Sequence, residues 1–296
     1  MPLKPVSELF AAALAGGYSL GYFESWNLES LLGIIDAAEQ TRSPVIIGFN
    51  GEHLTAPERL AQERIAVYGA LGKTAAENAS VPCGFIFNEC PSEPAVWQAV
   101  ETGFNLVMLV DQHANLDDYT RRVSRLVKFA HPRGVAVEAE IDELPCGASG
   151  EIDPSHSSLT DPDRAARFVT ETGIDLLSVS VGNVHILLQG EHDLDLERLA
   201  AIRQKVNIPL GLHGGSGISD ASLREAIKLG VTKVAYGTYL KRRYLSAVRD
   251  ALGDIELNPH ELLGMGGKKD VLTIGRAAVR EAVLERIHLL GCCGKA

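Results

Sequence analysis

Apolar runs recur along the whole chain and are separated by stretches with a helical period. Most of these runs lack the alternation of apolar and polar residues that marks a strand with one solvated face. Continuous apolar character is typical of parallel strands that are buried on both faces. The predicted strands are Tyr18–Tyr22, Pro44–Gly48, Cys83–Phe87, Asn105–Val110, Val135–Ile141, Leu176–Val181, Leu210–Leu212 and Thr232–Tyr236.

The stretches between these strands predict helices, and several have recognisable ends. Asp161 and Ser219 are of the residue types that cap helix N-termini, and Pro162 suits the first helical position. Gly173 and Gly230 stand where a helix would stop before the next strand. The predicted helices are Leu28–Gln40, Ala56–Asn78, Pro94–Thr102, Leu116–Ala130, Asp161–Thr172, Leu196–Lys205 and Asp220–Leu229.

Eight strands that alternate with helices predict an α/β protein with a (β/α)₈ TIM barrel, formed as one domain by residues 1–296. A doubly wound sheet is the alternative. The first predicted strand, however, leads into Glu24-Ser-Trp-Asn and not into a glycine-rich dinucleotide loop. Residues 252–296 form a C-terminal extension with a helix near Thr273–Leu289, which we expect to pack on a partner subunit. The long loop Asp142–Leu159 predicts a mobile active-site segment.

The charge and composition of the chain argue against several kinds of partner and cellular location. The formal net charge of −10 argues against binding to nucleic acid or to an anionic membrane. The N-terminus lacks the apolar core of a signal peptide, and no apolar run approaches the roughly 20 residues of a membrane span. Five cysteines do not form a disulfide framework. We therefore expect a reduced, cytoplasmic protein without nucleic-acid or membrane partners.

Three predicted strand ends carry side chains that bind metal ions. Glu89 follows the third strand, His185 lies shortly after the sixth, and His213 ends the seventh. The carboxyl ends of barrel strands converge on one face, so these side chains are expected to meet there. Two imidazoles and a carboxylate with an open coordination position suit a divalent metal, most often zinc. A single histidine at a strand end is more often a structural hydrogen-bonding group, so the prediction depends on the pair.

Glycine-rich segments follow the last two strands. Gly214, Gly215 and Ser216 come directly after His213, and Gly237 and Thr238 end the eighth strand. Small residues let backbone N–H groups approach an anion, and the loops after strands seven and eight form the usual phosphate site of a barrel. The alternative is two ordinary β–α turns.

These residues together resemble the class II, metal-dependent ketose-bisphosphate aldolases, which include fructose- and tagatose-bisphosphate aldolases. The similarity extends over nearly the whole chain and is most specific in the Leu-His-Gly-x-Ser-Gly block. The matching segments are Gly17-Tyr-Ser, Asn27-Leu-Glu29, Ser43-Pro-Val-Ile-Ile47, Val137-Glu-Ala-Glu140, Thr172-Gly-Ile-Asp175, Gly182-Asn-Val-His185, Pro209-Leu-Gly-Leu-His-Gly-Gly-Ser-Gly217 and Lys228-Leu-Gly-Val231.

The resemblance implies a homodimer or homotetramer in which zinc polarises a ketose carbonyl and the C3–C4 bond is cleaved to dihydroxyacetone phosphate and an aldehyde. It implies that His185 and His213 bind the metal, that Glu140 lies near it, and that Glu151 lies in a loop carrying a catalytic glutamate. It implies phosphate binding by Gly214, Ser216 and Thr238. The full set of predicted substrate- or phosphate-binding positions is Gly182, Gly214, Gly215, Ser216, Gly237 and Thr238.

The chain departs from the family pattern at the reacting centre. The family has Asp-His, an acid/base and a third metal ligand, where this chain has Asn88-Glu89. Asparagine cannot take a proton from a hydroxyl, whereas Glu89 could bind the metal or act as a relocated acid/base. An oxygen ligand could also favour manganese, iron or magnesium over zinc. Other departures are Ile186 for glycine, Ala235 for asparagine, and Val110, beside Asp111, for aspartate.

The sequence thus predicts an aldolase-type lyase that cleaves or forms a C–C bond in a phosphorylated ketose through a metal-stabilised enediolate. Its catalytic candidates are Asn88, Glu89, Glu140, Glu151 and Asp111, and its metal ligands are Glu89, His185 and His213. Two alternatives stay open. An isomerase or epimerase would use the same enediolate without an acid/base on the C4 hydroxyl, and a sugar-phosphate-binding barrel would not catalyse a reaction.

Overall fold

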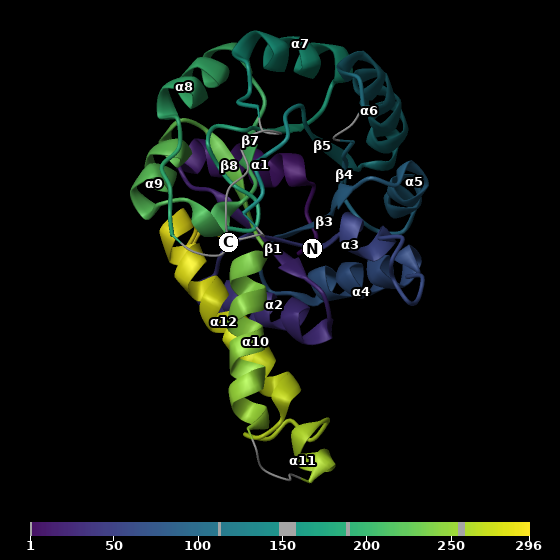
Figure 1. The fold of residues 1–296 in the computed structure, drawn as a ribbon, viewed down its shortest axis with the longest axis vertical. Coiled ribbons are helices and arrows are strands. Elements are labelled where there is room, and N and C mark those ends of the chain that lie inside the picture. Colours follow the sequence, from purple (N-terminus) through teal and green to yellow (C-terminus); the bar gives the residue numbers. More distant parts are fainter. Residues whose placement is uncertain (1, 112–113, 148–157, 188–189, 254–257) are drawn as a thin grey trace.

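Eight parallel strands close into a barrel in chain order, with β1 hydrogen-bonded to both β2 and β8 (Figure 1). The computed structural model describes residues 2–111, 114–147, 158–187, 190–253 and 258–296. The predicted strands and the (β/α)₈ architecture are confirmed. The strands are β1 (Leu20–Ser25), β2 (Val45–Asn50), β3 (Cys83–Cys90), β4 (Leu106–Leu109), β5 (Ala136–Glu140), β6 (Leu176–Ser178), β7 (Leu210–Leu212) and β8 (Val231–Tyr236).

Helices surround the barrel, and their ends follow the predicted capping chemistry. The Asp161 carboxylate accepts hydrogen bonds from the backbone N–H groups of Asp163 and Arg164, and Gly173 ends the same helix in the left-handed conformation. The helices between strands are α2 (Leu28–Thr41), α3 (Gly51–Thr55), α4 (Ile65–Asn78), α5 (Glu93–Glu101), α6 (Leu116–Ala130), α7 (Pro162–Thr172), α8 (Leu196–Lys205) and α9 (Asp220–Lys228).

One helix boundary differs clearly from the sequence prediction. The segment Ala56–Asn78 was expected to be one helix, but α4 begins only at Ile65. A separate short helix, α3, starts directly after β2 because the Asn50 side chain caps it by accepting from the N–H of His53. Pro57 and the fully exposed Leu60 lie in the connection between α3 and α4. This early turn brings α3 to the rim of the barrel, where the site lies.

An N-terminal helix, α1 (Val6–Gly16), covers the amino ends of the strands and was not predicted. The backbone N–H of Lys4 donates to the carbonyl of Cys83 at the start of β3, and Val6 and Leu9 are buried. The opposite end of the barrel is thereby left for the loops that follow the strands.

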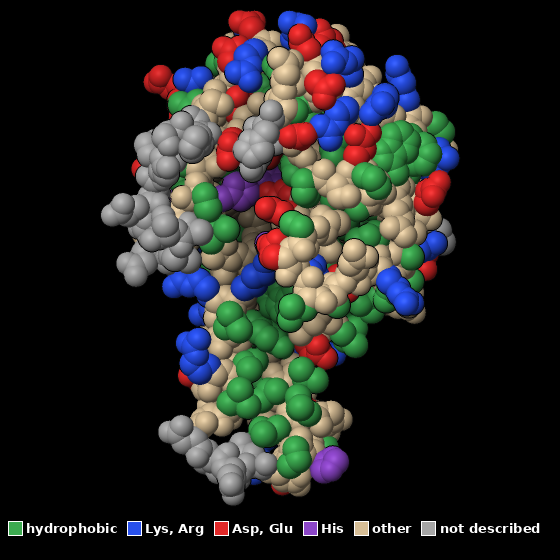
Figure 2. Space-filling view, turned by 45° about the vertical axis from the view of Figure 1, so that its right-hand side comes forward, with side chains coloured by type: hydrophobic (Ala, Val, Ile, Leu, Met, Phe, Trp, Pro, Cys, Tyr) green, Lys and Arg blue, Asp and Glu red, His purple; other side chains and the backbone are tan. Residues whose placement is uncertain are grey.

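The C-terminal helices form an arm that projects from the barrel. Helices α10 (Thr238–Leu252) and α12 (Val271–Leu290) lie side by side, and α11 (Pro259–Leu262) lies at the tip (Figure 1). Arg276 on α12 joins the arm to α2 through two 2.6 Å hydrogen bonds to Asp36. Apolar side chains are exposed along the arm (Figure 2), among them Leu245, Leu263 and Met265. Across the described ranges, no helix is both long and apolar enough to cross a bilayer.

Candidate active site

The end of β3 carries a bulge that points two consecutive side chains into the same pocket. The pairing with β4 runs from Phe87–Val107 to Cys90–Leu109, so β3 holds one extra residue there. Glu89 adopts a left-handed backbone with φ of 48°, a conformation that costs a non-glycine residue about 1–2 kcal/mol. Both Asn88 and Glu89 line the pocket as a result, which a regular strand with alternating side chains would not allow.

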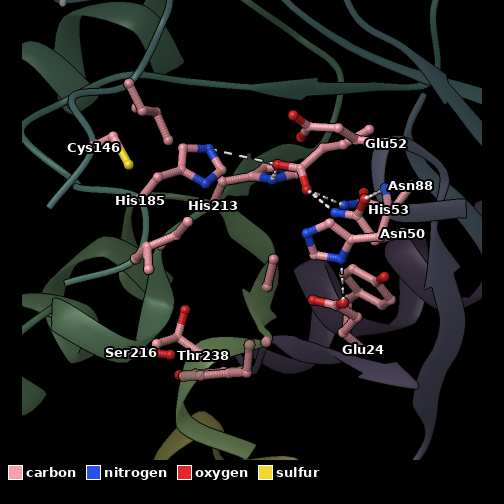
Figure 3. Close-up of a pocket in the computed structure, with 18 of the residues that line it drawn as sticks. Glu24, Asn50, Glu52, His53, Asn88, Cys146, His185, His213, Ser216 and Thr238 are labelled. Carbon is pink, nitrogen blue, oxygen red and sulfur yellow. Dashed lines mark hydrogen bonds and ion pairs between the residues drawn. The ribbon is translucent and has the colours of Figure 1, made fainter. Parts of the chain in front are cut away.

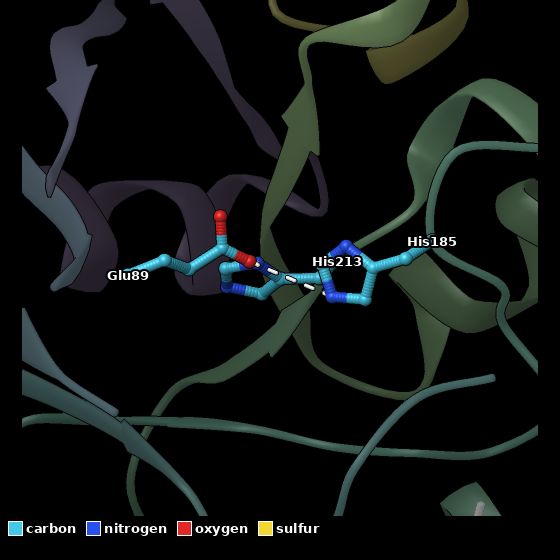
Figure 4. Close-up of side chains that lie close together, drawn as sticks. All are labelled: Glu89, His185 and His213. Carbon is cyan, nitrogen blue, oxygen red and sulfur yellow. Dashed lines mark hydrogen bonds and ion pairs between the residues drawn. The ribbon is translucent and has the colours of Figure 1, made fainter. Parts of the chain in front are cut away.

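Glu89, His185 and His213 converge at the mouth of the barrel (Figure 4). One carboxylate oxygen of Glu89 lies 2.6 Å from Nδ1 of His213 and 3.5 Å from Nε2 of His185. The three candidate ligand atoms all lie within 4.8 Å of one another. This donor set, two imidazoles and one carboxylate facing an open pocket, fits a divalent metal ion. The structure therefore brings together the three residues predicted to bind metal.

A buried carboxylate holds the other nitrogen of His213. Nε2 of His213 donates to Glu138 at 2.9 Å, and Glu138 accepts from Lys233 Nζ at 2.6 Å and from the Ser178 hydroxyl at 2.6 Å. The side chains of Glu138 and Lys233 are fully buried. Because Nε2–H is committed to Glu138, Nδ1 is the nitrogen that faces Glu89 and would face a cation.

The roles of Glu138 and Lys233 were not predicted from the sequence. Each is a charged residue inside a largely apolar, buried strand, Glu138 in β5 together with Glu140 and Lys233 in β8, and this was the available indication. A buried charge requires a partner, and these two strands supply opposite charges.

Burial and charge act together on the protonation of this cluster. Burial disfavours the imidazolium, but Glu89 and Glu138 outweigh it and raise the pKa of His213 to about 10. Burial likewise opposes ionisation of Glu138, yet Lys233 and His213 lower its pKa to about 2. The pKa of Glu89 is also lowered, against the effect of burial, by His213. The proton between His213 and Glu89 thus occupies the position of a small cation, which a metal would displace.

Asn88 is engaged with the protein. Its side-chain amide donates to Glu89 Oε2 at 2.8 Å, and its carbonyl oxygen lies 3.5 Å from Lys233 Nζ. Asn50 donates to the same Glu89 oxygen at 2.9 Å. Two amides therefore hold the Glu89 carboxylate in place.

A pocket of about 460 Å³ opens in front of this centre. Ser216 and Thr238 lie together on the side opposite Asn88 and Glu24 (Figure 3). Gly214 and Gly237 also line the pocket, as predicted for a phosphate site. Gly182 and Gly215 are not among the lining residues. A Cβ at Gly215 would collide with Val234 and the Ala235 carbonyl, so this glycine permits close packing of the loop on β8.

The remaining catalytic candidates are separated by the structure. Glu140 lines the pocket, and burial, followed by the charges of Glu89 and Glu138, raises its pKa to about 7 against the opposing effect of His213. Asp111 lies instead in a neighbouring cavity, where Arg122 donates to it at 2.5 Å. Glu151 lies outside the described residues.

Ile186, next to His185, retains a backbone conformation suited to glycine. Its φ is 51°, and its side chain is 41% exposed at the pocket wall. A β-branched residue in the left-handed region is a strained outlier. Ile186 thus stands in a backbone conformation that glycine adopts without steric cost.

A second group of polar side chains lines the pocket at the ends of β1 and β2. Glu24 Oε1 accepts from Lys241 Nζ at 2.5 Å and lies 3.2 Å from Nδ1 of His53. The Tyr22 hydroxyl, two residues before Glu24, is buried and has no hydrogen-bond partner in the described part of the chain. Of these residues, only Glu24 is a candidate for proton transfer from the sequence alone; the roles of Tyr22, His53 and Lys241 were not predicted.

Comparison with known proteins agrees with this geometry. Residues 4–295 match the family model of fructose-bisphosphate aldolase class-II. The chain is 34% identical to the uncharacterized protein YdjI of Escherichia coli (strain K12) over 94% of both chains. It is 31% identical to a fructose-bisphosphate aldolase of Geobacillus stearothermophilus over 100% of this chain and 99% of the relative.

A solved structure is similar along the entire length. The crystal structure of the YdjI aldolase from Escherichia coli K12 superposes with a TM-score of 0.81 and 31% identity, covering 100% of both chains. A family match over nearly all residues and relatives above 30% identity bear out the resemblance seen in the motifs. The chain belongs to the class II fructose-bisphosphate aldolase family.

Proposed function

We propose that this protein is a metal-dependent lyase of the aldolase type that cleaves or forms a C–C bond in a phosphorylated ketose. The observation that supports this most directly is that the metal-ligand candidates share one pocket with the predicted phosphate-binding residues Gly214, Ser216, Gly237 and Thr238. One small substrate could then place its carbonyl at the metal and its phosphate at the glycine-rich loops. Family membership supports the same reaction class.

Each group has a defined part in this proposal. A bound divalent metal would supply a positive charge that polarises the carbonyl and stabilises the developing negative charge. His213 would present Nδ1 because Glu138 holds Nε2. The backbone at Gly214 and the hydroxyls of Ser216 and Thr238 would hold the phosphate. Glu140, whose pKa of about 7 suits proton transfer at neutral pH, would move a carbon-bound proton.

Zinc is the metal that the family and the two imidazoles favour. Glu89 adds a hard, charged oxygen ligand, which would also accommodate manganese, iron or magnesium. The negative charge of Glu89 would lower the net positive charge of the centre and so weaken the polarisation of the substrate carbonyl.

The family match favours an aldolase over the isomerase, epimerase or non-catalytic sugar-phosphate-binding barrel that the sequence leaves open. The relatives reported above support none of these alternatives. We therefore treat them as outcomes that an experiment must be able to reveal.

The test is product analysis on a panel of ketose phosphates with metal-loaded and chelator-treated protein. We expect an aldehyde and dihydroxyacetone phosphate from the metal-loaded protein, and loss of both after chelation with recovery on adding zinc or manganese. His185→Ala should abolish cleavage, whereas His131→Gln, in a residue at the amino end of β5, should not. Full turnover by chelated protein would refute the proposal. A rearranged ketose without fragments would indicate an isomerase or epimerase, and tight sugar-phosphate binding without turnover a binding protein.

We also propose that the protein is a homodimer or homotetramer, as its family resemblance implies, with the C-terminal arm packing on a second copy of the chain. The exposed apolar side chains of Leu263 and Met265 near the tip support an interface there. Mass measurement by light scattering should show an oligomer that Leu263→Glu dissociates, whereas Leu60→Glu, at an exposed position away from the arm, should not. A monomeric wild-type protein would contradict this. A cytoplasmic location stays a prediction.

A further inference from the structure

The family's usual proton acceptor for the C4 hydroxyl is missing from this chain. Asn88 stands in its position, and an amide cannot accept the proton. The Asn88 side chain is 1% exposed and its amide is committed to Glu89. Cleavage of a C3–C4 bond requires that the C4 hydroxyl lose its proton as the bond breaks. Another group on the pocket wall must therefore accept this proton if the proposed function holds.

His53 has the geometry of an oriented general base. Its Nδ1 lies 3.2 Å from Glu24 Oε1, and a carboxylate can only accept, so the tautomer that makes this hydrogen bond has its proton on Nδ1. The neutral ring then has its lone pair on Nε2. Figure 3 shows this second nitrogen turned away from Glu24 toward the open middle of the pocket, and within the described residues it has no hydrogen-bond partner.

Two neighbours determine how His53 is held. Lys241 Nζ donates to the same Glu24 oxygen at 2.5 Å and lies 3.3 Å from Nδ1 of His53. The ammonium therefore helps to hold the carboxylate that orients the ring. Arg59 donates to the backbone carbonyl of His53 at 2.9 Å and anchors α3 beneath the ring. Glu52, on the same helix, also lines the pocket.

The same wall offers an unused hydrogen-bond donor. The Tyr22 side chain is 2% exposed and lines the pocket, but its hydroxyl has no partner among the described residues. Burial, with smaller effects of the Glu24, Glu89 and Glu138 charges, raises its pKa well above the usual value, so the phenol keeps its proton. A buried hydroxyl without a partner is costly unless a ligand atom completes it. A substrate oxygen between Tyr22 and His53 would do so.

Gly237 makes room for this arrangement. A Cβ built at residue 237 would collide with Glu24 Oε2. Glu24 thus reaches across the end of β8 and fills the space that a side chain there would take. The position of Glu24 in the pocket wall therefore requires a glycine at residue 237.

We propose that His53, oriented by Glu24, is the acid/base that acts on the C4 hydroxyl, with Tyr22 donating a hydrogen bond to the same oxygen. In cleavage, Nε2 of His53 takes the hydroxyl proton, the O–H electron pair forms the aldehyde C=O bond, and the C3–C4 pair remains on the enediolate fragment. In condensation, the imidazolium returns the proton to the oxygen. This inference rests on the proposed aldolase function.

The experiment compares two reactions of one protein that differ in their need for this base. Metal-loaded protein with dihydroxyacetone phosphate in D₂O should exchange a carbon-bound proton, a reaction that involves no C4 oxygen. Condensation of dihydroxyacetone phosphate with glycolaldehyde or glyceraldehyde requires a proton at that oxygen. We expect His53→Asn to lower the condensation kcat by roughly 100-fold or more and to leave exchange within about twofold. Asparagine keeps a donor toward Glu24 but has no basic nitrogen.

Further variants separate catalysis from structure. Added imidazole should partly restore condensation to His53→Ala, and His131→Gln should match the wild type in both reactions. Glu24 is a positioning residue, so Glu24→Gln should change the tautomer of His53 seen in ¹⁵N NMR spectra as well as lower kcat. Condensation by His53→Asn at the wild-type rate, or parallel loss of exchange and condensation in both His53 variants, would overturn the assignment to His53. Absence of both reactions in the wild-type protein would overturn the proposed function and this inference together.

Discussion

Two clusters of the same three residue types, glutamate, histidine and lysine, each place their histidine in the wall of one pocket and differ mainly in burial. In the first, Glu138 joins His213 to Lys233, and the His213 side chain is 2% exposed while the other two are fully buried. In the second, Glu24 joins His53 to Lys241, and the side chains of His53 and Lys241 are 52% and 32% exposed. In the first cluster, Glu138 and Lys233 lie behind the candidate metal ligand His213, whereas all three residues of the second cluster line the pocket.

The difference indicates how burial assigns separate tasks to similar chemistry. Charges in a low-dielectric interior interact strongly, so the buried cluster fixes one orientation and one protonation pattern of His213. Water at the rim weakens the same attractions, so the contacts among Glu24, His53 and Lys241 constrain the ring less. A metal site needs the first property, and an acid/base needs the second.

Replacing each lysine with methionine is the strongest test of this comparison. Lys233→Met leaves Glu138 buried without its ammonium partner, and we expect the free energy of unfolding to fall by about 3–5 kcal/mol. Lys241→Met breaks a partly exposed pair and should cost less than about 1 kcal/mol. Urea denaturation of both variants, in metal-free buffer, measures the two losses. Equal losses would show that burial does not distinguish the clusters.

Removing the charge of Glu89 tests whether the buried side is a metal centre. Glu89→Gln keeps the size of the side chain but removes an anionic ligand, and we expect zinc affinity to fall by roughly 100-fold or more. Titration calorimetry with a competing chelator gives the change. Glu24→Gln, the matched substitution at the rim, should leave zinc affinity within about threefold. A metal affinity that responds equally to both substitutions would place the cation elsewhere.

The pH dependence of the free energy of unfolding tests the burial of Glu140. Its pKa of about 7 lies above its ordinary value of 4.5, so the folded protein binds this proton more tightly than the unfolded chain. Stability is therefore lost as pH rises from about 4.5 through 7. Glu140→Gln, which stays neutral, should be more stable than wild type by roughly 3 kcal/mol at pH 8 and nearly equal to it near pH 4.5. Denaturation of the metal-free proteins at both pH values checks this, and a gain that does not depend on pH would contradict it.

The barrel could be predicted from the sequence because its strands are buried on both faces and read as continuous apolar runs. Glycine and N-cap residues such as Gly173 and Asp161 then marked the helix ends. The metal ligands followed, because strand carboxyl ends converge in any barrel. These inferences need only local patterns and the topology that the patterns imply.

The rest of the site depends on contacts that exist only after the barrel closes. Lys233 and Glu138 are 95 residues apart, and Lys241 and Glu24 are 217 apart. The bulge at Glu89 depends on the register between β3 and β4, which no local pattern of residues specifies. The short helix that carries His53 arises from the Asn50 cap, which the helical period of residues 56–78 obscured.

The smallest expected effect is the cost of backbone strain at Ile186, which does not depend on either cluster. It lies beside His185, in neither cluster, and its φ of 51° strains a β-branched residue. We expect Ile186→Gly to raise the free energy of unfolding by about 1 kcal/mol, because the relief of strain exceeds the added entropy of the unfolded chain. Ile186→Ala keeps a Cβ in the same backbone conformation and should gain less than half as much. If the alanine variant were as stable as the glycine variant, the cost would come from the exposed side chain, and the backbone beside the metal ligand would be unstrained.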